Sequence, residues 1–493
     1  MAPSVPGASS SALLPANASE GGTSHEGMVS AMGAAVAELV VSRFQESEEQ
    51  FVNSVLNATN QAGELVQNSE PVMMLEASQG GTFTYLVLQL IVMLGNATLF
   101  ASLGIGAMAF SRFYPPPEDE VVLEGLKASK PSIICMIPAL LEHEAELIVE
   151  TVRMALAVPE LDKVVLAYNT KSGEVKEVLA ELEQLRRKDP RLVLSHEPSS
   201  TSKAANLNAA LHLTEPYELT LILDADHHIE SVAIGRLVHS LRASPQSTAC
   251  MQGAVLVRGD GFWEYALTTL NWYFFSILFP GVQMISGTAM FAGAGAIWRS
   301  DVLRQFAFKD GMVCEDDDLS MRVITSGLNI GVCPQAELTE LAPESIHSFF
   351  RQRLRWTYGY EESLNKNLCP LICARPRASL QRIYVYSWHV MAVVWIASLV
   401  TYLTVHPNMS LWRGWLEPLA VMSGPVAAIF LCVLVMLHQN KWKRWKTTML
   451  MIPTAFIYGN MQAALTVWAR LRMICGMEWH VTRRKIRRED TGC

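Results

Sequence analysis

The stretch ELTLILDADHH, residues 218–228, joins an uncharged apolar run directly to a pair of carboxylates. A run this short, rich in Leu, Ile and Thr, is typical of a buried strand. Alternate side chains on an extended strand point the same way, so Asp224 and Asp226 can face one site. Such a pair can hold a hard divalent cation, which can bridge the phosphates of a nucleotide. A solvated turn at the strand end is the ordinary alternative.

The surrounding residues, from 111 to 383, have the pattern of an α/β domain. PSIICMIPA (131–139) and DKVVLAYN (162–169) are typical of short buried strands, whereas EVKEVLAELEQLRR (174–187) is typical of a helix. Strands that alternate with helices imply a mostly parallel sheet. Ligands of such sheets bind beyond the carboxyl ends of the strands, which is where the two aspartates fall.

The composition points to a lipid-facing surface outside this domain. Hydrophobic residues make up 50% of the 493 residues and charged residues only 17%, against about 25% in soluble domains. Residues 83–110 contain no charge and are long enough to span a bilayer, for which about 20 residues suffice. A net charge of -8 argues against a general nucleic-acid binder.

Three later runs, 384–405, 416–437 and 447–471, are also long enough to cross. The basic loop at 441–446 and the basic tail should face the cytosol, because cytosolic loops carry the excess of Lys and Arg. A full span at 447–471 would place that tail outside, so an interfacial or re-entrant path is expected there. The location that follows is a multi-pass protein of the plasma membrane or of the Golgi or ER membrane, with its α/β domain in the cytosol.

Five regions are therefore predicted. They are a low-complexity, partly helical, non-cytosolic region at 1–82 with helix-like spacing from 29 to 66, a transmembrane helix at 83–110, a cytosolic domain at 111–383, transmembrane or interfacial helices at 384–473, and a basic cytosolic tail at 474–493.

Two further stretches of the domain carry groups suited to chemistry. VCEDDDLSMR (313–322) contains four adjacent acids, which repel one another unless solvated or matched by cations. One of them could act as a general base on a hydroxyl, although an exposed acidic helix start is the alternative. FFRQRLRW (349–356) brings three arginines, which match phosphate oxygens bidentately, next to a tryptophan. A basic stripe beside a membrane is the alternative there.

Taken together, the motifs DxD, ED and QxxRW occur in this order within one α/β domain bounded by apolar segments. The chain resembles the membrane-embedded family 2 glycosyltransferases, which include cellulose, chitin, hyaluronan and mannan synthases. SKAANLNAAL (202–211), GTAMFAGAGAIWRSDVL (287–303) and EWHVTRR (478–484) are also similar to stretches of that family. The resemblance covers roughly residues 130–485. It implies a GT-A-like, Rossmann-like α/β domain inserted between transmembrane helices.

The resemblance also implies a role for each matching residue. Asp316, beside Glu315, would be the catalytic base, Asp226 would hold Mn2+ or Mg2+, and Trp356 would form a platform under the acceptor sugar. The residues implied to bind the nucleotide and its diphosphate are Asp224, Lys203, Gln352, Arg353 and Arg355. The second strand departs from the family pattern by ending in Tyr168 and Asn169 instead of acids. Asn169 could still hydrogen-bond a base edge.

The leading hypothesis is an inverting, processive polysaccharide synthase that uses a nucleotide sugar, in the first place a UDP-sugar. A non-processive transferase to a lipid acceptor and a catalytically weak membrane scaffold are the alternatives. The partners expected are the nucleotide-sugar donor, a polysaccharide or lipid-linked acceptor and membrane lipid, without nucleic acid. Self-assembly into an oligomer is left open.

Overall fold

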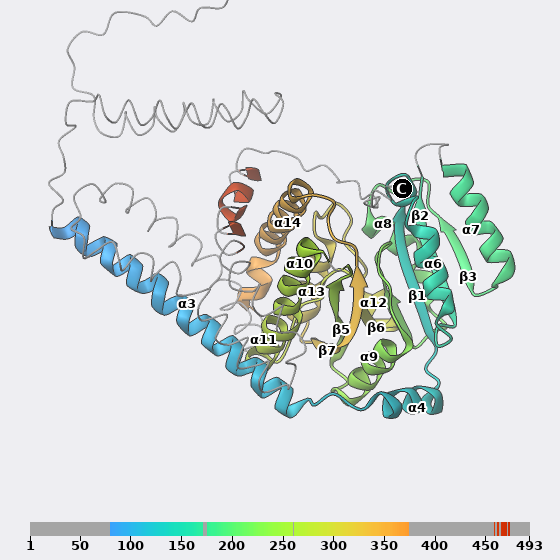
Figure 1. Cartoon of the computed structure of the whole chain (residues 1–493), viewed down its shortest axis with the longest axis horizontal. Coiled ribbons are helices and arrows are strands. Elements are labelled where there is room, and N and C mark those ends of the chain that lie inside the picture. The colour runs from blue at the N-terminus through green and yellow to red at the C-terminus, as the bar shows by residue number, and fades with distance from the viewer. Residues whose placement is uncertain are drawn as a thin grey trace, which may run out of the picture. The chain divides into compact units, whose positions relative to one another are not determined.

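The structure is a computed structural model, and it describes residues 79–170, 175–259, 261–373, 458, 461–462, 465–470 and 472–473 (Figure 1). Several predicted regions therefore lie outside the described residues. These are residues 1–78, the apolar runs 384–405 and 416–437, the basic loop 441–446, and the tail 474–493.

The described residues form a seven-stranded sheet in the order β3-β2-β1-β4-β6-β5-β7. The strands are β1 (Ile133–Leu140), β2 (Lys163–Asn169), β3 (Leu192–His196), β4 (Leu219–Ile222), β5 (Thr248–Val257), β6 (Ala296–Arg299) and β7 (Asn329–Glu340). All neighbouring pairs are parallel except those of β6, which runs antiparallel to both β4 and β5. The prediction of a mostly parallel α/β sheet is confirmed, and β6 is the one departure from it.

Strand β1 shows how the sequence fits a central strand. Its carbonyl at Met136 accepts a hydrogen bond from the N–H of Leu223. The backbone N–H and C=O groups of the even-numbered residues of β1 therefore point toward β4. The register with β4 ends at Met136, which pairs with Ile222, the last residue of β4. Pro138 also faces that side, and its missing N–H therefore leaves no ladder bond unmade.

The alternation of side chains along β1 divides the core between the two faces of the sheet. Ile133, Cys135 and Ile137 pack into one apolar cluster, which includes residues of α4, α6, α7 and α9. Ile134 and Met136 pack into a second cluster with residues of α8, α12 and α13. Figure 1 shows the sheet covered by helices on both sides.

The helices of the domain are α4 (Asp119–Ser129), α5 (Leu141–Glu144), α6 (Ile148–Ala157), α7 (Lys176–Lys188), α8 (Lys203–Ala210), the 3-10 helix η2 (Leu211–Thr214), α9 (Ser231–Ala243), α10 (Phe262–Tyr273), the π-helical η3 (Phe274–Leu278), α11 (Phe279–Ser286), α12 (Ser300–Phe306), α13 (Glu315–Thr325) and α14 (Ile346–Cys373). Three of them bear on function. Helices α8 and α13 begin at the carboxyl side of the sheet, and α14 packs against α13.

The long helix α3 (Gln79–Phe113) precedes the domain and packs on α11. The two helices approach closely because glycines face each other. A Cβ at Gly106 would lie 2.9 Å from the carbonyl oxygen of Gly281. Among the described residues, no helix combines the length and the apolar character needed to cross a membrane. The transmembrane helix predicted at 83–110, and the insertion of the domain between such helices, are thus not supported by this structure.

Candidate active site

Lys203 stands at the first turn of α8, where it faces the end of the acid-bearing strand. Ser202 caps this helix, its hydroxyl accepting the N–H of Ala205 at 3.0 Å. The Lys203 ammonium donates to Asp224 Oδ1 at 2.6 Å and to the carbonyl of Gly293 at 2.9 Å. It also lies 3.7 Å from Glu315 Oε1. Burial acts to lower the pKa of Lys203, but the charges of Asp224 and Glu315 outweigh it and raise the pKa.

Asp226 lies two residues beyond Asp224 and is 1% exposed. Its Oδ2 accepts the N–H of Leu341 at 3.3 Å, just past the end of β7. The turn that carries it is fixed by paired backbone bonds between His228 and Thr339, at 2.9 and 3.0 Å. Asp226 therefore faces the side of the site formed by β7, whereas Asp224 is engaged by Lys203.

Asp316 comes from the first turn of α13, where four acids are compatible with the positive end of the helix dipole. Its carboxylate lies directly against the backbone of Gly293. A Cβ at Gly293 would be 2.9 Å from Asp316 Oδ2, and the φ of Gly293 is +85°, so this position suits glycine alone. Asp316 is thus brought to the same place as Lys203, since both contact Gly293.

The electrostatic surroundings of Asp316 raise its pKa to about 6. Burial is the main cause, and the neighbouring carboxylate of Glu315 adds to it. Lys203 and Arg355 act in the opposite direction, because each favours the ionised form. A carboxylate with a pKa near 6 is still ionised at neutral pH, yet basic enough to accept a proton.

Gln252, in the middle of β5, is a residue of the site that the sequence analysis missed. It is fully buried, and it holds the loop on which Gly293 lies. Its side chain accepts the N–H of Ala292 at 2.9 Å and donates to the carbonyl of Ala294 at 2.9 Å. The signal was available, since Gln252 interrupts an otherwise apolar strand and a buried amide needs partners.

The three arginines of FFRQRLRW are separated by α14 into different environments. Arg351 is exposed and Arg353 is 6% exposed. Arg355 is half-buried, and its Nη1 donates to the carbonyl of Val313 at 3.2 Å, just before the acids of α13. Gln352 and Trp356 are half-buried on the same helix. Of the predicted phosphate ligands on α14, Arg355 is the one that the structure places beside Asp316.

Arg353 instead lies among aromatic rings. Its guanidinium carbon is 4.3 Å from the ring centroid of Trp356, 4.9 Å from that of Phe349 and 5.7 Å from that of Tyr458. An arginine so placed packs through cation–π contacts, and it joins α14 to the C-terminal segment. The structure gives no support to the expected contact of Arg353 with a pyrophosphate.

Replacing Arg353 with alanine should therefore affect stability first. We expect the free energy of unfolding to fall by about 1–2 kcal/mol, the sum of desolvated cation–π contacts. Thermal or urea denaturation of the purified protein measures this change. Arg351→Ala is the matched control, because Arg351 is exposed on the same helix. Equal stability of the two variants would contradict the structural role of Arg353.

Asn169 was expected to reach a base edge, but its amide is used inside the domain. It is 2% exposed. Its Nδ2 donates to the carbonyl of Ser200 at 2.6 Å, and its Oδ1 accepts from Asn206 Nδ2 at 3.0 Å. These bonds tie the end of β2 to the segment that leads into α8. In this structure Asn169 is part of the framework that places Lys203.

The fit of a divalent cation depends on the carboxylates at the end of β4. Among the described residues, no group of three or more His, Cys, Asp or Glu side chains could hold a metal ion by themselves. The oxygen donors of Asp226 suit Mg2+ or Mn2+, which commonly bind one or two carboxylates together with substrate phosphates. The residues therefore fit an ion that arrives with a diphosphate, and they do not form a complete cage.

Comparison with known proteins agrees with this arrangement. Residues 131–359, just under half of the chain, match the family model described as glycosyltransferase like family 2. The poly-beta-1,6-N-acetyl-D-glucosamine synthase of Staphylococcus epidermidis is 21% identical over 266 residues, which are 53% of this chain and 62% of that protein. The match thus spans less than two thirds of that relative.

A solved structure shows a similar fold. The mannosyltransferase of Pyrobaculum calidifontis, determined with GDP-mannose and Mn2+, is 16% identical, with a TM-score of 0.53. The similarity covers 79% of this chain and 100% of the mannosyltransferase chain. At this level of identity the likeness concerns the fold, which is a GT-A-like α/β fold.

Proposed function

We propose that the chain is an inverting glycosyltransferase that moves a sugar from a nucleotide diphosphate, in the first place a UDP-sugar, to a growing polysaccharide. One observation carries this proposal. Lys203, which is paired with Asp224, and Asp316 both contact Gly293, and Arg355 acts electrostatically on Asp316. Cations that can face a leaving diphosphate, next to a carboxylate that can accept a proton, suit transfer from a diphosphate donor. The matched family domain supports the same class of reaction.

In the proposed reaction, Asp316 accepts the proton of the acceptor hydroxyl. The acceptor oxygen then forms a bond to the anomeric carbon, while the bond from that carbon to the diphosphate oxygen breaks. The nucleoside diphosphate leaves with the electron pair, and attack opposite to it inverts the anomeric centre. Lys203 and Arg355 face the negative charge that grows on the leaving oxygens, and donors fixed in advance stabilise such charge most.

A divalent cation bound with the diphosphate would neutralise part of the same charge. Asp226 would hold it, as the buried carboxylate beside the nucleotide-facing Asp224. Asp224 is already paired with Lys203 at 2.6 Å, and we expect this ion pair to rearrange when a diphosphate enters. Trp356 is proposed to line the acceptor side.

The pH dependence of the reaction follows from Asp316. Its pKa, raised to about 6 by burial and by Glu315, means that the base is protonated below that pH. We therefore expect kcat/KM to fall tenfold per pH unit below about 6 and to level off above it. The groups around Asp316 are Glu315, Asp317, Lys203 and Arg355. A profile flat between pH 5 and 8 would contradict the assignment of the base.

A donor screen tests the proposed function. Purified protein is incubated with Mn2+ or Mg2+ and one labelled donor at a time, including UDP-N-acetylglucosamine, UDP-glucose and GDP-mannose. Polymer of increasing length supports the proposal. A single sugar that is extracted into organic solvent would indicate transfer to a lipid, and absence of both incorporation and UDP binding would indicate a scaffold. No incorporation from any donor overturns the proposal.

The location at a membrane with the domain in the cytosol is proposed from the sequence. The basic residues of 441–446 and 482–489 support a cytosolic placement, whereas Arg43 is the sole Lys or Arg in residues 1–82. Glycosylation of the sequon at Asn17 in a eukaryotic host tests the orientation. We expect Asn17 to be glycosylated. An unmodified Asn17 that can be labelled from the cytosolic side would contradict the proposed orientation.

A further inference from the structure

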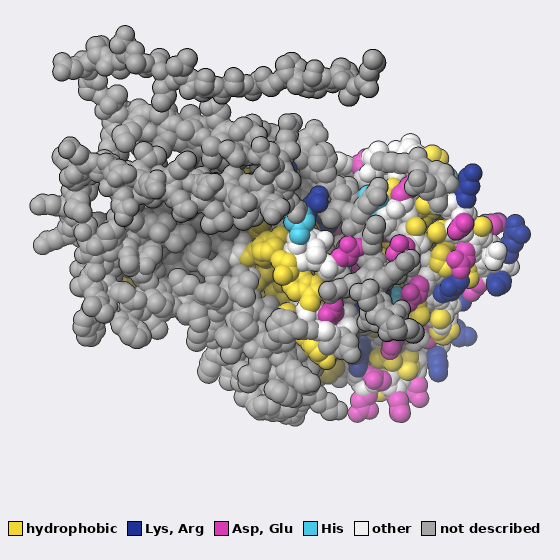
Figure 2. Space-filling view, turned by 45° about the horizontal axis from the view of Figure 1, so that its top comes forward, with side chains coloured by type: hydrophobic (Ala, Val, Ile, Leu, Met, Phe, Trp, Pro, Cys, Tyr) yellow, Lys and Arg dark blue, Asp and Glu magenta, His cyan; other side chains and the backbone are white. Residues whose placement is uncertain are grey.

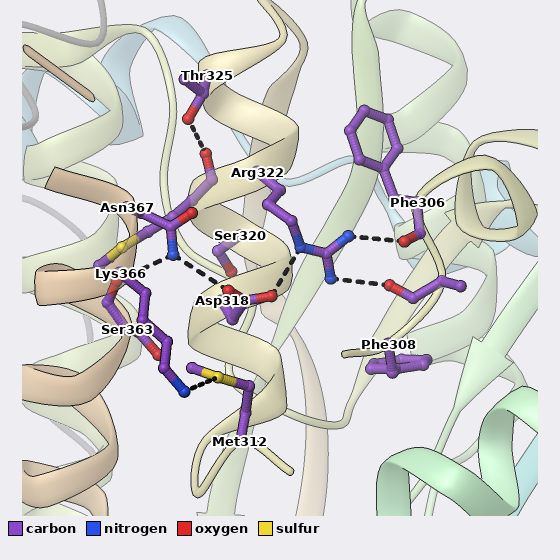
Figure 3. A network of polar contacts seen from close by, with 12 residues as sticks. Phe306, Phe308, Met312, Asp318, Ser320, Arg322, Thr325, Ser363, Lys366 and Asn367 are labelled. Atoms are coloured by element: carbon purple, nitrogen blue, oxygen red, sulfur yellow. Dashed lines mark hydrogen bonds and ion pairs between the residues drawn. The ribbon is translucent and has the colours of Figure 1, made fainter. Parts of the chain in front are cut away.

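A buried carboxylate, Asp318, joins the helix that carries Asp316 to two neighbouring elements (Figure 3). Asp318 lies on α13 and is 1% exposed. Its Oδ2 accepts from Arg322 Nε at 2.7 Å, and its Oδ1 accepts from Asn367 Nδ2, on α14, at 3.1 Å. Figure 3 shows Asp318 between these two side chains. Both oxygens are thus engaged, one within α13 and one across to α14.

Arg322 extends this connection to the end of α12. Its Nη1 donates to the carbonyl of Phe306 at 2.6 Å, and its Nη2 donates to the carbonyl of Ala307 at 2.9 Å. Ala307 has a φ of 49°, a conformation that a residue with a side chain seldom adopts, so the chain is bent sharply where Arg322 holds it. Helix α13 is therefore fixed from both sides through one carboxylate.

A second set of contacts ties the start of α13 to α14. The N–H of Val313 donates to Glu362 Oε2 at 3.0 Å, and the hydroxyl of Ser363 donates to the carbonyl of Cys314 at 3.4 Å. Gly359 lets the two backbones touch, because a Cβ there would lie 2.8 Å from the nitrogen of Cys314. These contacts and the Asp318–Asn367 bond lie at successive positions along α14. Together they fix the position of α13 relative to α14.

The position of Asp318 on the helix explains what this connection achieves. Successive residues of an α-helix are about 100° apart, so Asp318 projects about 200° away from Asp316. Asp318 therefore anchors the rear of α13 while Asp316 projects toward Gly293 and Arg355. Replacement of a buried ionic group by apolar residues is often neutral or stabilising. Stability alone is thus a weak reason for a charge at this place.

We propose that Asp318 and Asn367 are a positioning pair, which fixes the direction in which α13 presents Asp316 relative to Arg355 of α14. This inference rests on the proposed transferase function. Neither residue contacts the substrate in this account. Their effect is on kcat, since a misplacement of a reacting group by about 1 Å can cost about 100-fold in rate. Binding of UDP, which uses Lys203, Asp224 and Arg355, should change little.

An exchange of the two side chains tests the pair. Asn367→Asp places two carboxylates opposite each other, and we expect kcat to fall about 100-fold with the Kd for UDP and Mn2+ within about threefold of wild type. Adding Asp318→Asn restores the bridge, because the amide introduced on α13 accepts from Arg322 and donates to the carboxylate introduced on α14. The bond from Asn367 Nδ2 to the carbonyl of Ser363, at 2.9 Å, is lost in both variants, so their difference reports the bridge. The double variant should regain kcat to within about threefold of wild type. Asn367→Ser, a milder change, should lose about tenfold.

The control is Glu218→Gln, which removes a carboxylate from an exposed pair with Arg242 at 3.0 Å. It should keep wild-type kcat. A folded Asn367→Asp variant with wild-type kcat overturns the inference, as does a double variant that regains thermal stability but not kcat. If wild type transfers no sugar from any donor, the proposed function fails. The pair is then tested by hydrogen exchange of amides 319–324, which are bonded within α13. Their exchange must become faster in Asn367→Asp and return to the wild-type rate in the double variant.

Discussion

The Asp316→Asn variant is expected to lose about 10²–10⁴-fold in kcat, the contribution that a positioned general base makes. Asparagine has nearly the same shape, so it fits against Gly293, where Asp316 Oδ2 now lies. It cannot accept the proton of a hydroxyl at neutral pH. The affinity for UDP should be retained, because Lys203, Asp224 and Arg355 are unchanged. Initial rates of sugar transfer and calorimetric UDP binding measure the two effects separately.

Asp317→Asn is the matched control for this prediction. Burial, together with the charges of Asp316 and Asp318, raises the pKa of Asp317 well above its usual value. A carboxyl that favours its neutral form is mimicked by an amide, so activity should stay within about threefold of wild type. If Asp316→Asn keeps wild-type kcat, or if both variants lose activity equally, Asp316 is not the base.

The second large effect is expected at Arg355. Arg355→Ala should lower kcat/KM by about 10²–10³-fold, the usual cost of removing one donor from a site where charge develops. The Kd for UDP should rise as well, because a guanidinium pairs with phosphate oxygens already in the bound state. Steady-state rates and UDP titration, both at fixed ionic strength, measure these changes. Arg355→Lys should restore charge but only part of the rate, since an ammonium lacks the planar fork.

Arg351→Ala and Arg353→Ala complete that series on one helix. Arg351 is exposed, and its removal should leave kcat/KM unchanged. Arg353 lies among three rings, so its removal should lower stability more than UDP affinity. A result in which all three arginines lower UDP affinity alike would show that α14 presents a diffuse basic surface in place of a specific clamp.

The distribution of charge on the surface is consistent with a local site. In the view of Figure 2, acidic side chains lie across the described face next to a hydrophobic area, and many basic ones lie toward its margin. Apart from this surface charge, Lys203 of α8 and Arg355 of α14 are the cations that act on Asp316.

Much of the fold could be predicted from the sequence, because the runs that form β1, β2 and β4 are short and almost wholly apolar, as buried strands are. Those residues of the site could be predicted that lie at the end of a strand or in a recognisable motif. Asp224 follows β4, and Lys203 begins a capped helix. The direction of β6 could not be predicted. Its four residues, Ala296–Arg299, are too few to show a period, and its antiparallel pairing is set by tertiary contacts.

The environments of the three arginines could have been predicted in part. Residues 351 and 355 are one helical turn apart and share a face, whereas 353 points to the opposite side. The aromatic rings around Arg353 could not all be predicted, because one of them, Tyr458, is distant in sequence. The hydrogen bonds of Asn169 could not be predicted either, because its partners Ser200 and Asn206 come close to it only when β2 and α8 are packed together.

The most direct test of the central claim is an experimental structure of the protein with a UDP-sugar and Mn2+. The diphosphate is predicted within hydrogen-bonding distance of Arg355 and Lys203, with the Asp316 carboxylate on the opposite side of the anomeric carbon. A nucleotide bound elsewhere, or Asp316 turned away from the sugar, would contradict the account.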